Sequence, residues 1–304
     1  MLTRRAILAG SVAAAVGART RAAAQDPSPA PPCPVARVAL VASANQYGSI
    51  AQQLGGRCAE VTSIMSNPKT DPHEFQTDIA VARAYQRAEL VVDNGLGYDD
   101  FSRKIVATLR RKPIVVTAGD VVGLKVGDNP HVWYDPQYID RVAEALTEAF
   151  ERLRPAAAAY FGAQARGFAE SLRPYRSAIE TIRRGFAGTP IGATESIFVY
   201  MARATGLALV TPPKFMAAVA EGAQPSVADM IAFHTQIEQR QIRVLVYNTQ
   251  TVTNMTRELQ ERARAAGVPV VGISETLVPP TATFQAWQVR QLEAVRLALG
   301  GGAR

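Results

Sequence analysis

Two histidines in proline-containing loops are the residues best suited to bind a metal ion. His73 lies in the segment Asp71-Pro72-His73-Glu74-Phe75, and His131 lies in Asn129-Pro130-His131-Val132-Trp133. A proline before each histidine fixes the local backbone and disfavours a helical conformation in the residue before the proline. Imidazole is a common ligand of first-row metal ions. A pair of ordinary loop histidines remains the alternative, because no local spacing such as His-x-x-x-His joins them.

The second half of the chain offers carboxylates in place of histidines. Glu195 follows the apolar run 191–193, and Glu275 follows the run 268–273. Each carboxylate also has a simpler explanation, as a charge at a helix N-terminus for Glu195 or as a solvated loop charge for Glu275. The third histidine, His234, lies inside a predicted helix over 226–240, which favours a surface or interhelix position.

Short apolar runs alternate with helix-like stretches in both halves of the chain. This alternation predicts parallel sheets with right-handed crossovers. In the first half we expect strands at 35–41, 61–65, 90–92 and 114–116, with helices at 47–54, 77–87 and 101–111. In the second half we expect strands at 191–193, 207–210, 244–247 and 268–273, with helices at 197–205, 226–240, 253–266 and 284–299.

The segment 137–184 contains no strand-like run and is rich in helix-forming residues. It predicts a helix over 137–153, followed by a long helix over 155–184 that is bent or disturbed near Pro174. The fold class is therefore α/β, with two lobes that each hold a parallel sheet flanked by helices and are joined by one long rigid helix. The expected parts are an N-terminal metal-binding lobe (35–153), the linking helix (154–187) and a C-terminal metal-binding lobe (188–304).

Ligands of open parallel sheets bind at the carboxyl ends of the strands, so the cleft between the two sheets is the expected site.

The N-terminus has the composition of an export signal. Two arginines, Arg4 and Arg5, precede a small-residue apolar stretch that ends near Ala24. We predict a signal peptide over 1–24, of the twin-arginine type or of the ordinary secretory type, and a flexible leader over 25–34. No cysteine stands at the cleavage point and no later apolar run is long enough to span a bilayer, which predicts a soluble periplasmic protein without a lipid anchor.

The basic net charge is weak evidence for a nucleic-acid or membrane partner. The net charge is +7, but four of the basic residues lie in the predicted signal peptide. The segment Asn94-Gly95-Leu96-Gly97-Tyr98 lacks the third glycine and the downstream acid of a dinucleotide site, so a tight loop beside the cleft is the better interpretation. The chain has two cysteines, Cys33 and Cys58, each placed before a predicted strand. They form a disulfide or stay as two thiols, and they lack the partners of a structural zinc site.

Taken in order along the chain, these segments resemble the periplasmic metal-binding proteins that supply zinc and manganese ABC importers. The resemblance runs over nearly the whole mature chain and rests on these segments: Val38-Ala39-Leu40-Val41-Ala42-Ser43, Asp71-Pro72-His73, Asn94-Gly95-Leu96-Gly97-Tyr98, Asn129-Pro130-His131-Val132-Trp133-Tyr134-Asp135-Pro136, Thr194-Glu195 and Gly272-Ile273-Ser274-Glu275-Thr276.

The resemblance implies one Zn²⁺ or Mn²⁺ held by His73, His131, Glu195 and Glu275, two ligands from each lobe. In the family, histidine is usual at the Glu195 position of zinc-binding members, glutamate is usual there in manganese-binding members, and aspartate is usual at the Glu275 position. The implied protein is a monomer and not an enzyme. It would carry the ion as cargo to the membrane permease subunits of an ABC importer.

Ligand chemistry alone leaves the choice between zinc and manganese open. Carboxylates favour a harder ion such as Mn²⁺, whereas the general affinity order places Zn²⁺ above Mn²⁺. Two other functions also stay open. A zinc-dependent hydrolase could use two histidines and a carboxylate, although a fourth ligand would close the position needed for water. An adhesin-like binder could use the same scaffold without a metal.

Overall fold

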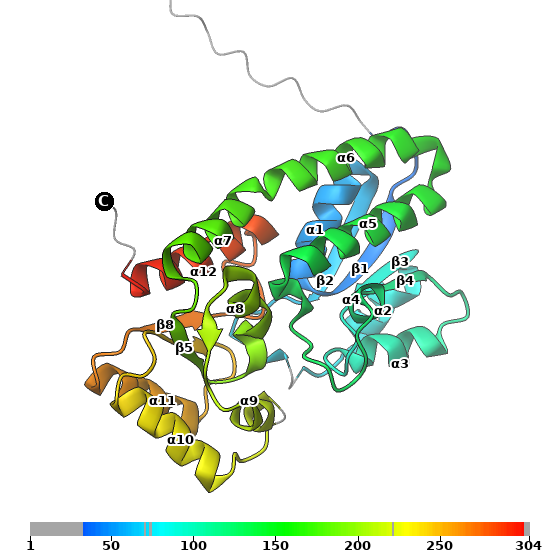
Figure 1. Cartoon of the computed structure of the whole chain (residues 1–304). Coiled ribbons are helices and arrows are strands. Elements are labelled where there is room, and N and C mark those ends of the chain that lie inside the picture. Colours follow the sequence, from blue (N-terminus) through cyan, green and yellow to red (C-terminus); the bar gives the residue numbers. More distant parts are fainter. Residues whose placement is uncertain (1–32, 70, 73–74, 221, 301–304) are drawn as a thin grey trace, which may run out of the picture. The chain divides into compact units, whose positions relative to one another are not determined.

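The structure is a computed structural model that describes residues 33–69, 71–72, 75–220 and 222–300 (Figure 1). The predicted signal peptide over 1–24, most of the predicted leader and His73 lie outside the described residues. Within these ranges, no helix has both the length and the apolar character needed to cross a membrane.

The first sheet contains four parallel strands in the order β2-β1-β3-β4. The strands are β1 (Val38–Ala44), β2 (Ala59–Met65), β3 (Leu90–Asp93) and β4 (Ile114–Thr117). Its helices are α1 (Asn45–Gly55), α2 (Ile79–Arg87), α3 (Asp100–Thr108), α4 (Ala118–Val122) and α5 (Pro136–Leu153). Strands β1 and β3 are buried on both faces, which explains why their sequences read as continuous apolar runs.

The second sheet repeats this topology with the order β6-β5-β7-β8, again all parallel. Its strands are β5 (Pro190–Ala193), β6 (Ala208–Leu209), β7 (Leu245–Asn248) and β8 (Val270–Ile273). Its helices are α8 (Val199–Thr205), α9 (Pro213–Ala220), α10 (Val227–Glu238), α11 (Asn254–Ala265) and α12 (Phe284–Ala298). The prediction of two parallel α/β sheets is therefore confirmed. The short helices α4 and α9 were not predicted, because each is too brief to show a clear helical period.

Capping side chains fix where several helices begin. Asp135 accepts hydrogen bonds from the amides of Gln137 and Tyr138 at the start of α5, whose first residue is a proline. Thr253 and Thr256 form a capping box at the start of α11. These side chains bind backbone amides that the first helical turn leaves without partners, so the helix boundaries follow from local sequence.

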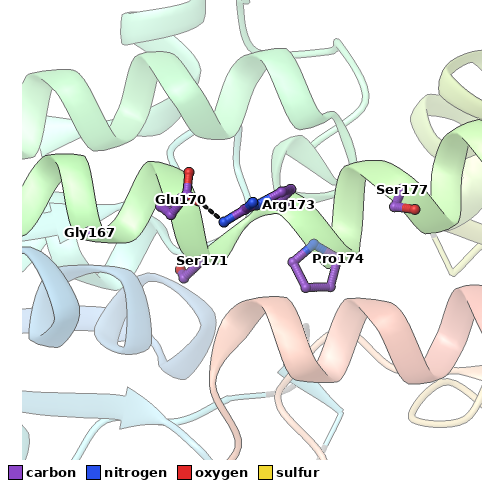
Figure 2. A pocket seen from close by; sticks show the side chains of 6 residues that line it. All are labelled: Gly167, Glu170, Ser171, Arg173, Pro174 and Ser177. Carbon is purple, nitrogen blue, oxygen red and sulfur yellow. Dashed lines mark ion pairs between the residues drawn. The ribbon is translucent and has the colours of Figure 1, made fainter.

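The connection between the two sheets consists of two successive helices, and the prediction of one long helix is corrected in this respect. Helix α6 (Ala158–Ser171) ends one residue before α7 (Arg173–Phe186). The break falls at Leu172, because Pro174 has no amide hydrogen to donate to the carbonyl of Glu170. Figure 2 shows this position, where Glu170 and Arg173 form an ion pair at the edge of a groove of about 670 Å³. The proposed domain boundaries remain a prediction.

Helix α12 connects the second sheet to the first half of the chain. It lies beside α7 (Figure 1) and also contacts α1. The Gln285 amide donates to Gln53 Oε1 at 2.7 Å and to Ser171 Oγ at 2.9 Å. The Gln288 amide donates to the Trp133 carbonyl at 3.0 Å. The last helix of the chain is therefore part of the contact between its two halves.

A disulfide joins Cys33 and Cys58, with 5.1 Å between their Cα atoms. The two cysteines precede β1 and β2, which pair as parallel neighbours with Val38 opposite Ala59. The disulfide is one of the two outcomes that the sequence allowed. It closes a loop of 25 residues, which restricts the unfolded chain and stabilises the folded state.

Candidate metal site

Buried polar residues gather in the loops at the carboxyl ends of both sheets. A chain usually places polar side chains at its surface, so buried polar groups concentrated in these loops point to a binding site. The buried polar residues that end a strand or follow one within a few positions include Asn45, Gln46, Asn94, Asp99, Thr194, Glu195, Thr211, Asn248, Gln250, Ser274, Glu275 and Thr276.

His131 is completely buried and held in one orientation. Its Nδ1 lies 2.7 Å from Oδ1 of Asn129, and its ring packs edge-on against Trp133 with the centroids 5.4 Å apart. An amide oxygen can only accept a hydrogen bond, so Nδ1 carries a proton, and in the neutral imidazole Nε2 then carries the lone pair. Fixing the tautomer through the other ring nitrogen is the usual arrangement of a metal-binding histidine.

Asn129 also connects His131 to the second half of the chain. Its amide Nδ2 donates to the carbonyl of Ser196 at 2.8 Å, directly after Glu195. Its own carbonyl accepts a hydrogen bond of 2.8 Å from the hydroxyl of Tyr200. One side chain thus orients the imidazole and links it to the loop that carries a candidate carboxylate ligand.

We expect Asn129→Ala to weaken Zn²⁺ binding about 10- to 100-fold, the usual effect of losing an outer partner of a metal-binding histidine. The substitution removes the hydrogen bond that fixes the His131 tautomer and the hydrogen bond to the Ser196 carbonyl. Calorimetric titration of the metal-stripped protein measures it. Gln239→Ala, at an exposed position after α10, is the control and should bind as the wild type does. Unchanged affinity in Asn129→Ala would contradict the assigned role.

Glu195 and Glu275 are both buried and both receive hydrogen bonds from the loop after β7. Glu195 is 1 % exposed, and its Oε1 accepts from the Thr251 hydroxyl at 3.1 Å. Glu275 is 0 % exposed, and its Oε1 accepts from the Asn248 amide at 2.5 Å. A buried carboxylate needs hydrogen bonds or a cation to offset its lost hydration, so these donors stabilise charged groups that remain suited to a metal ion.

Tyr98 brings the first sheet into contact with Glu275. Burial, together with the charge of Glu275 and a hydrogen bond to its carboxylate, holds the pKa of Tyr98 well above its usual value. Tyr134 makes a second contact of this kind, because its hydroxyl donates to the carbonyl of Ser274 at 2.8 Å. Side chains of the first half therefore reach the loop that carries Glu275.

The predicted four-ligand set stays a prediction, and the structure shows where three of its residues lie. His131, Glu195 and Glu275 all lie in buried loops at strand ends, whereas His73 lies outside the described residues. Among the described residues, no three His, Cys, Asp or Glu side chains are grouped closely enough to hold a metal ion. The complete set thus remains a prediction.

The third histidine, His234, is half-buried within α10, and its charge interaction is with Glu258 of α11. This position between helices agrees with the sequence interpretation.

Several residues of the site were missed by sequence reasoning. Asn129, Asn248, Gln250 and Thr251 were not assigned a role, although each contacts a candidate ligand or its backbone. A signal was available for Asn248, which directly follows the predicted strand 244–247, much as Glu195 follows its own strand. Asn129 stands two residues before His131, in a segment that the sequence analysis had already singled out. Thr251 had no such signal, because its contact with Glu195 joins segments 56 residues apart.

The glycine-containing loop after β3 is built around Asp99. The Asp99 carboxylate accepts hydrogen bonds from the backbone amides of Asn94 at 2.6 Å and of Gly95 at 2.8 Å. A phosphate would need such amides, so their use by Asp99 supports the interpretation as a tight loop. The loop also contacts the segment that carries His131, since the side-chain amide of Asn94 donates to the Pro130 carbonyl at 3.0 Å, one residue before His131.

Asp99 makes the stability of this loop dependent on pH. Burial, then the charge of Asp93, raises the pKa of Asp99 to about 7. The folded protein therefore holds a proton that the unfolded chain releases above about pH 4, and stability should fall as pH rises from about 4 to 7. We expect Asp99→Asn to reduce this decrease in stability with rising pH. Urea unfolding of both proteins at pH 4.5, 6 and 7.5 measures it, and equal pH dependence in the two would contradict the assignment.

The protein has two parallel sheets, and buried polar side chains lie in the loops at their carboxyl ends. This is the architecture of an α/β protein of the solute-binding class. The chain belongs to the family described as ZnuA, zinc-uptake complex component A, periplasmic, whose model matches residues 40–298. The match covers most of the chain and includes His131, Glu195 and Glu275.

Individual relatives and solved structures agree with this assignment. The chain is 28 % identical to the iron-binding protein YfeA of Yersinia pestis over 136 residues, which are 41 % of this chain and 42 % of YfeA. Alignments with the curated relatives span less than half of their lengths.

Among solved structures, the periplasmic zinc-binding protein TroA of Treponema pallidum has a TM-score of 0.73 at 16 % identity, with 86 % of this chain and 99 % of TroA covered. A manganese-bound periplasmic metal-binding protein mutant of Candidatus Liberibacter asiaticus has a TM-score of 0.71 at 21 % identity, with 86 % and 99 % covered. Because the sequence identities are only 16 % and 21 %, the similarity to these two structures establishes the fold alone.

Proposed function

We propose that this protein captures a divalent transition metal ion, Zn²⁺ or Mn²⁺, in the periplasm and delivers it to an ABC importer. The observation that carries the proposal is the set of three buried candidate ligands at the carboxyl ends of the two sheets, within a chain of the zinc-uptake family. Names of similar proteins that mention zinc, manganese and iron support an ion of this class.

In the proposed site, His131 would bind the ion through Nε2, and Glu195 and Glu275 would each supply a carboxylate. His73 would complete the set from the segment that precedes Phe75. Two carboxylates balance the charge of a divalent ion, and two imidazoles add neutral donors. Such a balance offsets the cost of holding two buried negative charges together.

Ion binding would draw the candidate ligands of the two halves together. Asn129 and Tyr98 already connect loops of the first sheet to loops of the second, so the movement would start from existing contacts. The consecutive helices α6 and α7, together with α12, would keep this movement small. A loaded form that differs from the empty form would give the membrane permease subunits a basis for distinguishing the two.

We propose further that the protein acts as an exported monomer without a lipid anchor and carries out no chemical reaction on its cargo. A hydrolase would need an open position on the metal for water and a nearby general base. A hydrolytic assay of the zinc-loaded protein tests this point. Zinc-dependent turnover that is lost in His131→Ala would contradict a purely transporting role.

The main test is calorimetric titration of the chelator-stripped mature protein with Zn²⁺ and Mn²⁺ in parallel. The proposal expects one ion per chain and a rise in the melting temperature when the ion is added, because a ligand that binds only the folded state stabilises it. The absence of binding for both ions, in a protein whose circular dichroism shows it to be folded, would overturn the proposed function.

A further inference from the structure

His131 lines a cavity of about 730 Å³. The walls of this cavity come from both halves of the chain: the loop after β3 and the segment 127–131 belong to the first half, and α8 and α9 belong to the second. Pockets that bind small organic molecules usually have volumes of about 300 to 1,000 Å³. The cavity is therefore much larger than a single metal ion requires, and it has the size of a site for an organic molecule.

Apolar side chains form most of the cavity wall. Helix α9 contributes Met216, Ala217 and Ala220, whose spacings of three and four residues place them on one face of the helix. Further apolar side chains come from neighbouring elements: Leu96, Val199 and Leu209. Such a wall favours an apolar group and offers few oxygen atoms to replace the water around a metal ion.

The charged groups of the wall also differ from those expected for a free cation. Among the described residues that line the cavity, Asp128 is the acidic side chain and Arg203 is the basic one. Arg203 also forms an ion pair of 2.6 Å with Asp135. An excess of acidic groups would attract a free divalent cation, and the lining has no such excess.

We propose that the cavity receives the apolar body of a small organic chelator, so that the ion reaches His131 as a neutral complex. This inference rests on the proposed function. Carboxylates of the chelator would neutralise the charge of the ion, and its apolar atoms would pack against α9 and Leu96. Because α6, α7 and α12 would keep the movement between the two halves small, the cavity would remain in the loaded form.

Two chelators with the same donor atoms test the proposal. Pyridine-2,6-dicarboxylate and iminodiacetate each bind Zn²⁺ through a nitrogen and two carboxylates in a neutral one-to-one complex, but only the first contains an aromatic ring. Equilibrium dialysis of the metal-stripped protein against each complex measures how much zinc and how much chelator stay with the chain. We expect at least about 10-fold stronger retention of the pyridine complex, since even one methylene group in an apolar pocket changes affinity by about that factor.

A substitution in α9 tests the place of binding. Ala217→Trp puts a large side chain into the cavity and should weaken retention of the pyridine complex by about 10-fold or more. The affinity for Zn²⁺ added without a chelator should stay unchanged, because α9 carries none of the candidate ligands. Lys214→Trp is the matched control, since Lys214 is an exposed residue of the same helix outside the cavity lining, and this variant should retain the complex as the wild type does.

Three results would overturn the inference and leave the proposed function intact. The first is equal retention of the two complexes, or zinc retained without its chelator. The second is retention of the pyridine complex that Ala217→Trp does not change. The third is equally strong binding of pyridine-2,6-dicarboxylate in the absence of Zn²⁺, which would indicate a site for an organic acid alone. A wild type that binds zinc neither as the free ion nor as a complex would overturn the proposed function itself.

Discussion

His131→Ala is expected to weaken Zn²⁺ binding by more than about 100-fold, beyond the range for residues that contact a ligand only indirectly. The imidazole is completely buried and its tautomer is fixed by Asn129, so Nε2 is the nitrogen prepared to bind an ion. Alanine removes this donor nitrogen. Calorimetric titration of the metal-stripped variant measures the loss.

His234→Ala is the matched control for this experiment. His234 is half-buried within α10, away from the loops at the strand ends, and its removal should leave the affinity for Zn²⁺ unchanged. Equal weakening in the two variants would indicate an indirect effect on folding, and unchanged binding in His131→Ala would remove His131 from the site. The melting temperature of each metal-free variant separates these outcomes.

Trp133→Ala is expected to lower the free energy of unfolding by about 3 to 5 kcal/mol, the usual cost of deleting a large buried aromatic side chain. Trp133 is 0 % exposed. Its ring centroid lies 5.0 Å from that of Tyr98, 5.4 Å from that of His131 and 6.3 Å from that of Tyr47. The substitution would therefore open a cavity beside His131, and Zn²⁺ affinity should fall together with stability. Urea denaturation of the metal-free proteins measures the first effect.

Two further variants make this result interpretable. Trp133→Phe keeps much of the aromatic volume and should recover a large part of both stability and affinity. Ile79→Ala removes a large apolar side chain that is 71 % exposed and should change stability by less than about 0.5 kcal/mol. A Trp133→Ala protein as stable as the wild type would show that the aromatic cluster is not a main support of the site.

Most of the fold could be predicted from local patterns. The apolar runs that predicted strands correspond to β1–β8. The pattern is clearest for β1 and β3, because a strand buried on both faces must be apolar along its whole length. Pro174 indicated where the linking segment is disturbed, since proline cannot donate the helical hydrogen bond. The break into α6 and α7 and the short helices α4 and α9 were less accessible, because their lengths depend on packing against neighbouring elements.

For the site, the rule that ligands bind beyond the carboxyl ends of parallel strands points to Glu195 and Glu275 as candidates, and their role as metal ligands stays a prediction. The same rule could not reveal what holds these carboxylates. Thr251 and Glu195 are 56 residues apart, and Asn129 and Ser196 are 67 residues apart. No periodicity or motif in one segment records such a contact.

The sequence by itself determined the two parallel sheets, the loops that carry the candidate ligands and the chemical types of those ligands. These properties depend on burial patterns and on residue types close together along the chain. Only the tertiary structure decided which side chains contact the two candidate carboxylate ligands: Asn248 contacts Glu275 and Thr251 contacts Glu195. A hydrogen bond depends on distance and direction, and for the two glutamates these are set only when β5, β7 and β8 pair side by side.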